Sequence, residues 1–265
     1  MTKPKILLEN VGKTFRTRRQ EIEALRDINM KVYEHEIVSL IGPSGCGKST
    51  IIRLLDDIIK PTCGKITVDN YEYSGKPVPK DVIRNFGFVF QHPNLLPWMT
   101  VRKNMLFPLR VFGDKDPKWN EYVEKLLDMA NMLEYADAYP DQLSGGMLQR
   151  VGVLRAMTHQ PPILLMDEPF GALDEVLREQ LDMETMRMRE QLNQTILFVT
   201  HNIKEAVFVS DRVYVLDTRP GRIVDEIVID LPRERTKEVC ATRKYNEYVI
   251  DLTNKIGTVD LKLIK

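Results

Sequence analysis

One short stretch of the chain combines two glycines, a lysine and a serine at a spacing suited to binding phosphate. Residues 42–50 read GPSGCGKST and fit the pattern G-x-x-x-x-G-K-[ST]. Glycines let the backbone curl so that successive N–H groups point inward, and a helix that begins there adds the positive end of its dipole. The Lys48 ammonium would reach the β- and γ-phosphates of a nucleotide, and the Ser49 hydroxyl would reach Mg²⁺. The expected nucleotide contacts of this phosphate loop are Gly42, Pro43, Ser44, Gly45, Cys46, Gly47, Lys48, Ser49 and Thr50.

A second candidate for chemistry is a pair of carboxylates at the end of an apolar run. Residues 163–166 are all apolar, and Asp167 and Glu168 follow them directly. A buried strand delivers its last side chains to the carboxyl edge of a sheet, where such folds bind ligands. Asp167 would hold the Mg²⁺ shell, and Glu168 would act as the general base that polarises the attacking water. The alternative is an ordinary surface pair of acidic residues after a strand.

The third candidate is the stretch LSGGMLQR at residues 143–150. A serine and two glycines that open a helix make a second anion site, because their N–H groups have no intrahelical acceptors. One chain does not need two sites for a γ-phosphate. The second site makes sense if it serves the nucleotide of a neighbouring copy.

These three stretches, taken in order, resemble the motifs of ATP-binding-cassette (ABC) ATPases, and LSGGMLQR resembles their signature motif. The resemblance covers residues 5–230. It implies a head-to-tail homodimer around two ATP molecules with Mg²⁺. Each ATP would lie between the phosphate loop of one copy and Ser144, Gly145 and Gly146 of the other.

The resemblance also assigns roles to single residues, each of which has an ordinary alternative. Phe15 resembles the aromatic that stacks on adenine, but it could pack in the core. Gln91 resembles the glutamine that contacts Mg²⁺ and signals to the membrane subunit, Asp174 lies in a loop that crosses the dimer interface, and His201 resembles the histidine on the γ-phosphate. Their alternatives are a solvated loop amide, a helix N-cap and a histidine satisfied at a strand end. The expected catalytic residues are Glu168, His201 and Lys48, and the expected metal contacts are Ser49, Gln91 and Asp167.

The elements that must position these residues alternate between strand and helix patterns. Apolar runs at 37–41, 86–90 and 195–199 predict buried strands, and a return strand is expected at 64–69. Helical patterns are expected at 49–59, stopped by Pro61, at 101–159 and at 173–192. Asn202 and Glu205 suggest a capping box, a hairpin is expected around 219–221, and the tail predicts one or two short helices.

The expected fold is therefore α/β. The family resemblance implies a P-loop NTPase (RecA-like) core with an N-terminal antiparallel β subdomain and an inserted α-helical subdomain. We expect an ABC domain over residues 1–230, in which the core covers 1–90 and 161–230 and the helical insertion covers 91–160. A short tail follows at 231–265.

Composition restricts the class of partner. Lys+Arg and Asp+Glu both number 38, so no basic excess indicates nucleic-acid binding. The three cysteines have no metal spacing and favour a reducing compartment. Cys46 could be a modifiable thiol, although a small side chain filling the loop is the simpler interpretation. No apolar run approaches the roughly 20 residues that cross a bilayer, and no secretory signal is recognisable. At a membrane, the protein would be held on the cytoplasmic face by a partner.

Residues 93–99, PNLLPWM, place four large apolar side chains in an expected loop after Gln91. In the family this docking segment receives a helix of a transmembrane permease, but its side chains could instead fold into the insertion's own core. The single cassette, Met147 and residues 218–222 resemble importers of the nitrate, sulfonate and taurine group, which work with a permease and a solute-binding protein. Alternatives are a soluble ABC ATPase not coupled to transport and a regulatory module without turnover. Glu168 and His201 argue against the module, and the absence of N-K-x-D argues against a GTPase.

Overall fold

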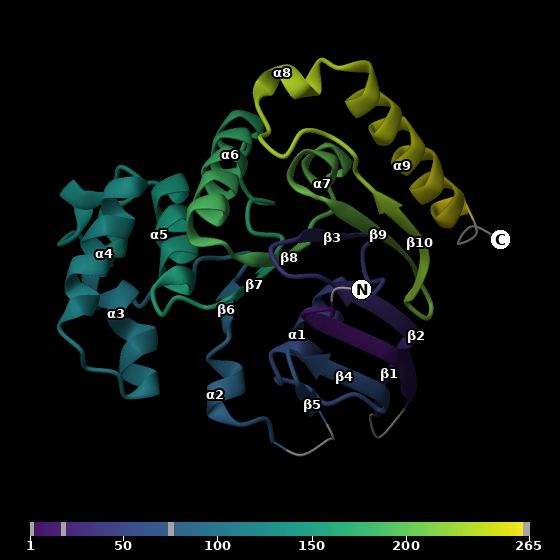
Figure 1. Ribbon diagram of the computed structural model, residues 1–265, viewed down its shortest axis with the longest axis horizontal. Coiled ribbons are helices and arrows are strands. Elements are labelled where there is room, and N and C mark those ends of the chain that lie inside the picture. Colours follow the sequence, from purple (N-terminus) through teal and green to yellow (C-terminus); the bar gives the residue numbers. More distant parts are fainter. Residues whose placement is uncertain (1–2, 17–19, 74–76, 262–265) are drawn as a thin grey trace. The chain divides into compact units, whose positions relative to one another are not determined.

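The computed structural model describes residues 3–16, 20–73 and 77–261 (Figure 1). Contacts divide the chain into two units, one made of Met1–Ile83 with Thr195–Lys265 and the other of Arg84–Gln194. The first unit carries the phosphate loop and His201, and the second carries Gln91, the two carboxylates and residues 143–150.

The first unit contains a four-stranded antiparallel sheet in the order β2-β1-β4-β5. Strand β2 buries Leu25, Ile28, Met30 and Val32 while the residues between them are mostly exposed, as expected of a sheet with one face on the core. This sheet is the N-terminal antiparallel β subdomain that the family resemblance implies. Its strands are β1 (Ile6–Arg16), β2 (Glu21–Val32), β4 (Cys63–Val68) and β5 (Tyr71–Tyr73).

The second sheet of this unit carries the phosphate loop. Strand β3 pairs in parallel with β8 on one side and with β9 on the other, and β10 pairs with β9 as an antiparallel hairpin. All five residues of β3 are buried, which is why its sequence is a continuous run rather than an alternation. The strands are β3 (Ile37–Ile41), β8 (Thr195–Val199), β9 (Arg212–Asp217) and β10 (Arg222–Val228).

Two of the predicted helices in this unit differ from expectation. Helix α1 ends at Leu55 rather than at residue 59, because Asp57 takes a left-handed φ of 56° and the Ile59 amide turns back to the Arg53 carbonyl at 3.1 Å. The tail forms one short helix and a second helix of 19 residues, so the prediction of short helices was wrong for the second. The helices are α1 (Lys48–Leu55), α2 (Lys80–Ile83), α7 (Ile203–Val209), α8 (Lys237–Cys240) and α9 (Arg243–Leu261).

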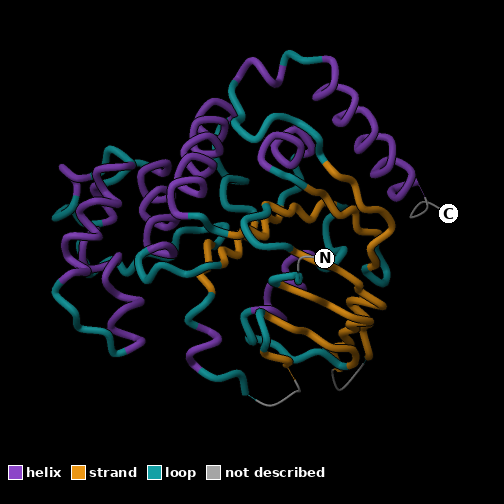
Figure 2. The backbone as a smooth tube through the Cα atoms, viewed as in Figure 1, coloured by secondary structure: helices purple, strands orange, loops and turns teal. Residues whose placement is uncertain are grey.

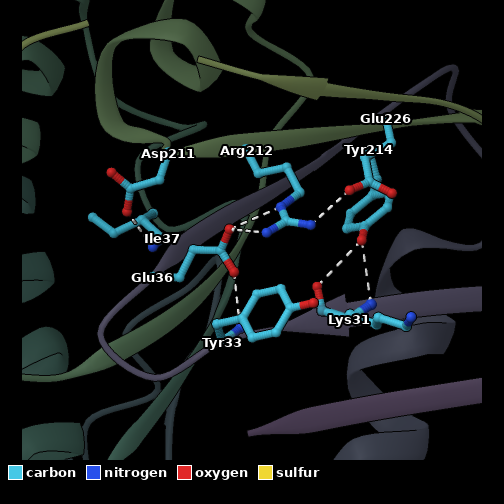
Figure 3. Close-up of polar contacts among 8 residues, drawn as sticks. All are labelled: Lys31, Tyr33, Glu36, Ile37, Asp211, Arg212, Tyr214 and Glu226. Atoms are coloured by element: carbon cyan, nitrogen blue, oxygen red, sulfur yellow. Dashed lines mark hydrogen bonds and ion pairs between the residues drawn. The ribbon is translucent and has the colours of Figure 1, made fainter. Parts of the chain in front are cut away.

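A polar cluster ties together the amino ends of β3 and β9, opposite the end of β3 that leads into the phosphate loop (Figure 3). Arg212 binds Glu36 at 2.7 Å and Glu226 at 2.6 Å, and its guanidinium lies over the Tyr33 ring. Burial raises the pKa of the Glu36 carboxyl even though the Tyr33 amide and Arg212 both favour its charged form. Because Asp211 also accepts from the Ile37 amide at 2.8 Å, the register of β3 is fixed where the strand begins.

The second unit pairs two parallel strands and connects them through helices. Strand β6 runs beside β7, with Val89 opposite Met166. The chain between the two strands is drawn as helix and loop alone in Figure 2, in agreement with the helical pattern predicted for 101–159. The elements are β6 (Phe86–Val89), α3 (Val101–Phe112), α4 (Lys118–Met129), α5 (Gly145–Met157), β7 (Ile163–Asp167) and α6 (Glu175–Leu192), with 3-10 turns at Leu133–Tyr135 and Pro140–Gln142.

Within the described ranges, none of the helices has both the length and the apolar character needed to cross a bilayer.

Candidate active site

The phosphate loop connects the buried strand β3 to helix α1, as the sequence predicts. Gly47 is the N-cap of α1 and has a φ of 99°, in the region that favours glycine. The Lys48 side chain is only 6% exposed, and its ammonium donates to the Gly42 carbonyl at 2.8 Å and to the Pro43 carbonyl at 3.1 Å. The charge of Lys48 therefore lies inside the curve of the loop, beside the positive end of α1.

Two glycines of the loop fit against neighbouring strands with no room for a side chain. A Cβ at Gly47 would lie 2.4 Å from Leu25 on β2, and a Cβ at Gly42 would lie 2.6 Å from the carbonyl oxygen of Leu216 on β9. The glycine pattern is thus needed for packing as well as for the turn.

A third glycine, which is distant in the sequence, presses on the loop from outside. A Cβ at Gly221 would lie 2.0 Å from the carbonyl oxygen of Cys46. Gly221 is held there by two backbone hydrogen bonds to β2, from its amide to Ala24 at 3.0 Å and from Arg26 to its carbonyl at 2.9 Å. Sequence reasoning used residues 218–222 only as a turn and a mark of resemblance, and it missed this contact.

Cys46 itself is 0% exposed, and burial raises the pKa of its thiol. Its sulfur lies 3.8 Å from the Lys48 ammonium. The structure therefore favours the interpretation of Cys46 as a side chain that fills the loop.

His201 and Phe15 belong to the same unit as the phosphate loop. Strands β3 and β8 run in parallel with Leu40 opposite Val199, so Gly42 and His201 follow the carboxyl ends of neighbouring strands. His201 is exposed there. Phe15 lies near the end of β1 with its side chain 37% exposed, so it is not a core residue, and the Lys13 ammonium lies 5.1 Å from the centre of its ring.

The polar residues around His201 form a tighter arrangement than the expected capping box. The Asn202 side chain accepts from the Glu205 amide at 3.3 Å, which is half of such a box. The Glu205 carboxylate hydrogen bonds to the Thr200 hydroxyl, and the Thr200 oxygen accepts from the Asn202 amide at 2.9 Å. The residues directly before and after His201, Thr200 and Asn202, are therefore hydrogen bonded to each other.

In the second unit, the register of β6 and β7 brings Gln91 and the carboxylates to one edge. Val89 lies opposite Met166, so Gln91 and Glu168 each stand two residues beyond a paired position. Asp167 and Glu168 are half-buried, and Glu168 takes a left-handed φ of 47°, which is uncommon for a residue with a side chain. The carboxylate of Asp167 and the amide oxygen of Gln91 are hard donors of the kind that bind Mg²⁺. Both groups are chemically suited to that ion.

The signature stretch (residues 143–150) opens helix α5 as expected. Ser144 is the N-cap and accepts from the Met147 amide at 3.4 Å, and a Cβ at Gly145 would meet nothing within 4 Å. Gly146 is different, because a Cβ there would lie 2.6 Å from Leu177 on α6. Asp174 caps α6 by accepting from the Leu177 amide at 3.0 Å, which is the ordinary role considered for it above. The structure thus brings residues 144–146 and Asp174 together at adjacent helix starts.

Helix α5 also binds the chain around Gln91, which sequence reasoning did not foresee. Gln149 donates to the Phe90 carbonyl at 3.2 Å, and Arg155 donates to the carbonyls of Pro93 at 2.6 Å and Asn94 at 2.9 Å. Gln149 lies inside the signature stretch, so its position gave a signal. Arg155 gave none, because its partners are backbone carbonyls.

The backbone of the docking segment (residues 93–99) is hydrogen bonded to a buried asparagine, while one large apolar side chain of the segment is exposed. Asn104, which is 0% exposed, accepts from the Leu96 amide at 2.7 Å and donates to the Met99 carbonyl at 3.0 Å. Leu95, Leu96 and Met99 are half-buried, whereas Trp98 is 69% exposed. The alternative that Trp98 folds into the core of the insertion is therefore wrong.

Comparison with known proteins identifies the class. The family model described as ABC transporter matches residues 25–171. The chain belongs to the ABC transporter family, and it is an ATPase whose nucleotide is ATP. Its fold is that of the P-loop NTPases, as the sequence predicts.

Two of the similar proteins are ATP-binding proteins of importers. The chain is 40% identical to the nitrate import ATP-binding protein NrtD of Synechocystis sp., over 85% of this chain and 82% of NrtD. It is equally 40% identical to the aliphatic sulfonates import ATP-binding protein SsuB 1 of Xanthomonas axonopodis pv. citri, over 90% of this chain and 91% of that protein. Among solved structures, the ATP-binding cassette MJ0796, a dimer in a post-hydrolysis state bound to ADP and Pi, matches with a TM-score of 0.74 and 33% identity. The match covers 86% of this chain and all of that one.

Proposed function

We propose that this ATPase is the energy-supplying subunit of an importer of the nitrate, sulfonate or taurine type. Two copies would close head to tail around two ATP molecules and drive solute uptake through a separate permease on the cytoplasmic face of the membrane, fed by a solute-binding protein. The observation that carries the proposal is the pairing, in one chain, of a phosphate loop holding the Lys48 ammonium with a second helix start, at Ser144–Gly146, suited to an anion. The similarity to NrtD, a nitrate import protein, and to SsuB 1, an aliphatic sulfonates import protein, supports the solute class.

The roles of the site residues follow from their chemistry. The Lys48 ammonium and the amides of the phosphate loop hold the β- and γ-phosphates, and Phe15 stacks on the adenine. Mg²⁺, when bound, neutralises charge on the phosphates, and Ser49, Gln91 and Asp167 would hold it. Glu168 takes a proton from the attacking water, and His201 hydrogen bonds to the γ-phosphate. Residues 144–146 and Asp174 complete the nucleotide site of the other copy.

The docking segment is the proposed contact with the permease. Trp98 is 69% exposed on a segment whose backbone is fixed by Asn104 and Arg155, so a large apolar surface is presented on a rigid support. A soluble ABC ATPase would use no such contact. A pull-down from detergent-solubilised membranes that recovers a permease with the wild-type chain, and not with Trp98→Ala, supports the coupled function.

The catalytic role is tested with Glu168→Gln, which keeps the size and shape of the side chain but removes the base. We expect ATP binding to be retained while turnover falls roughly 10²–10⁴-fold. The matched control is Glu179→Gln, an exposed position on α6, which should hydrolyse ATP as the wild type does. Normal turnover in Glu168→Gln would show that Glu168 is not the base.

A further inference from the structure

The C-terminal segment, residues 231–261, contacts helix α7. Helix α7 begins directly after His201 and Asn202. Helix α7 has only seven residues, too few to be stable by itself, so its position depends on what it packs against. Helix α9 packs against it, as Figure 1 shows, with Leu252 of α9 0% exposed.

Two side chains of this segment bind the backbone at opposite ends of α7. Near its start, the Tyr245 hydroxyl donates to the Lys204 carbonyl at 3.0 Å, and Tyr245 is 5% exposed. At its end, the Arg235 guanidinium donates to the carbonyls of Phe208 at 3.1 Å and Ser210 at 2.9 Å. Carbonyl groups at the end of a helix have no N–H donor within the helix, so Arg235 caps them. The segment therefore restrains α7 against both sliding and tilting.

This restraint extends to His201. The residues on either side of it, Thr200 and Asn202, are hydrogen bonded to each other, and Thr200 is also bonded to Glu205 in the first turn of α7. A displacement of α7 would therefore move the His201 ring with it. Lys204, the residue whose carbonyl Tyr245 binds, stands three positions after His201.

We propose that the C-terminal segment positions His201 for catalysis, and that Tyr245 is the positioning residue at the end of α7 nearest to it. This inference rests on the proposed role of His201 at the γ-phosphate. It gives residues 231–261 a function within the ATPase itself.

The test is Tyr245→Phe, which keeps the buried ring and removes only the hydroxyl. We expect kcat for ATP hydrolysis to fall roughly 3–10-fold, the effect of losing one neutral hydrogen bond, while KM for ATP and the Kd of a non-hydrolysable ATP analogue stay within twofold. The matched control is Tyr248→Phe on the same helix, whose hydroxyl accepts from the Asp230 amide at 3.0 Å. That variant should keep the wild-type kcat.

A second measurement separates positioning from a loss of stability. The chain has four histidines, so the His201 imidazole resonance can be assigned by its absence in His201→Gln. We expect Tyr245→Phe to shift that resonance, and Tyr248→Phe to leave it unchanged. Equal kcat values for the two tyrosine variants, or an unshifted His201 resonance in Tyr245→Phe, would overturn the inference. Full activity of His201→Gln would instead overturn the role of His201 in the proposed function.

Discussion

At the scale of single residues, the phosphate loop packs against Gly221, which lies 174 positions after Gly47 in the sequence. Beside the Cys46 carbonyl there is no room for a side chain at position 221. The amide and the carbonyl of Gly221 are both hydrogen bonded to β2. The loop cannot retreat easily, since Gly42 is already against Leu216. A side chain at position 221 must therefore displace the loop backbone or break the pairing.

We predict that Gly221→Ala weakens ATP binding about tenfold or more, because overpacking against backbone costs about 1–3 kcal/mol. Isothermal titration with ATP in the absence of hydrolysis measures the change in Kd. Gly257→Ala, on α9 where a Cβ would meet nothing within 4 Å, is the control and should bind as the wild type does. An unchanged Kd for Gly221→Ala would mean that the loop adapts without cost.

At the scale of elements, helix α5 connects two parts of the proposed mechanism. Its first turn carries the signature stretch, and its later turns bind Phe90, Pro93 and Asn94. From Ser144 to Arg155 an α-helix rises about 16 Å. A displacement at the start of α5, the proposed anion site, would therefore be carried as a rigid movement to the docking segment.

We predict that Arg155→Ala loosens the docking segment, because the Pro93 and Asn94 carbonyls lose their charged donor. The reporter is Trp98. The chain has two tryptophans, so Trp119→Phe leaves Trp98 as the only tryptophan, which can be excited selectively over the tyrosines. In that background Arg155→Ala should lower the fluorescence anisotropy of Trp98 and reduce the free energy of unfolding by about 1–3 kcal/mol.

The control for this experiment is Arg102→Ala in the same unit, which removes an ion pair with Glu124, whose side chain is 52% exposed. Such pairs contribute about 0–1 kcal/mol, so the anisotropy of Trp98 should not change. If the two arginine variants behave alike, α5 does not hold the docking segment.

At the scale of the whole molecule, the proposal requires that the phosphate loop and the signature stretch act in different copies of the chain. Homodimeric cassettes of this family support such an assembly. In a head-to-tail dimer, each nucleotide site takes its loop from one copy and residues 144–146 from the other.

We predict that two inactive variants restore activity when mixed. Lys48→Ala removes the ammonium from the loop. Gly145→Asp places a negative charge at the signature stretch, where a Cβ meets nothing within 4 Å and folding should be preserved. Half of randomly mixed dimers carry one intact site of two, so ATPase activity should recover to about a quarter of the wild-type value.

The control mixes Lys48→Ala with Ser49→Ala, two variants of the same loop, and should show no recovery. Failure of Lys48→Ala and Gly145→Asp to complement each other would mean that the two motifs do not meet across a dimer.

The sequence alone was sufficient to place the motifs that combine fixed residue types at short spacing on their strands and helices. The phosphate loop, the carboxylates after residues 163–166 and the N-cap at Ser144 are such cases, and the buried strands were evident because each is a continuous apolar run. Prediction was wrong at the end of α1 and in the tail. At the end of α1, Asp57 adopts a left-handed conformation. In the tail, α9 packs against α7, a long-range contact that the local sequence pattern does not reveal.

Only the tertiary structure decided what supports those motifs. Gly221 faces the carbonyl of Cys46, Arg155 binds the carbonyl of Pro93, and Tyr245 binds the carbonyl of Lys204. Every residue carries a carbonyl group, so the acceptor leaves no mark in the sequence, and a donor far along the chain has no spacing by which to recognise it. The sequence thus predicts which residues do the chemistry, while the fold alone determines which residues hold them in place.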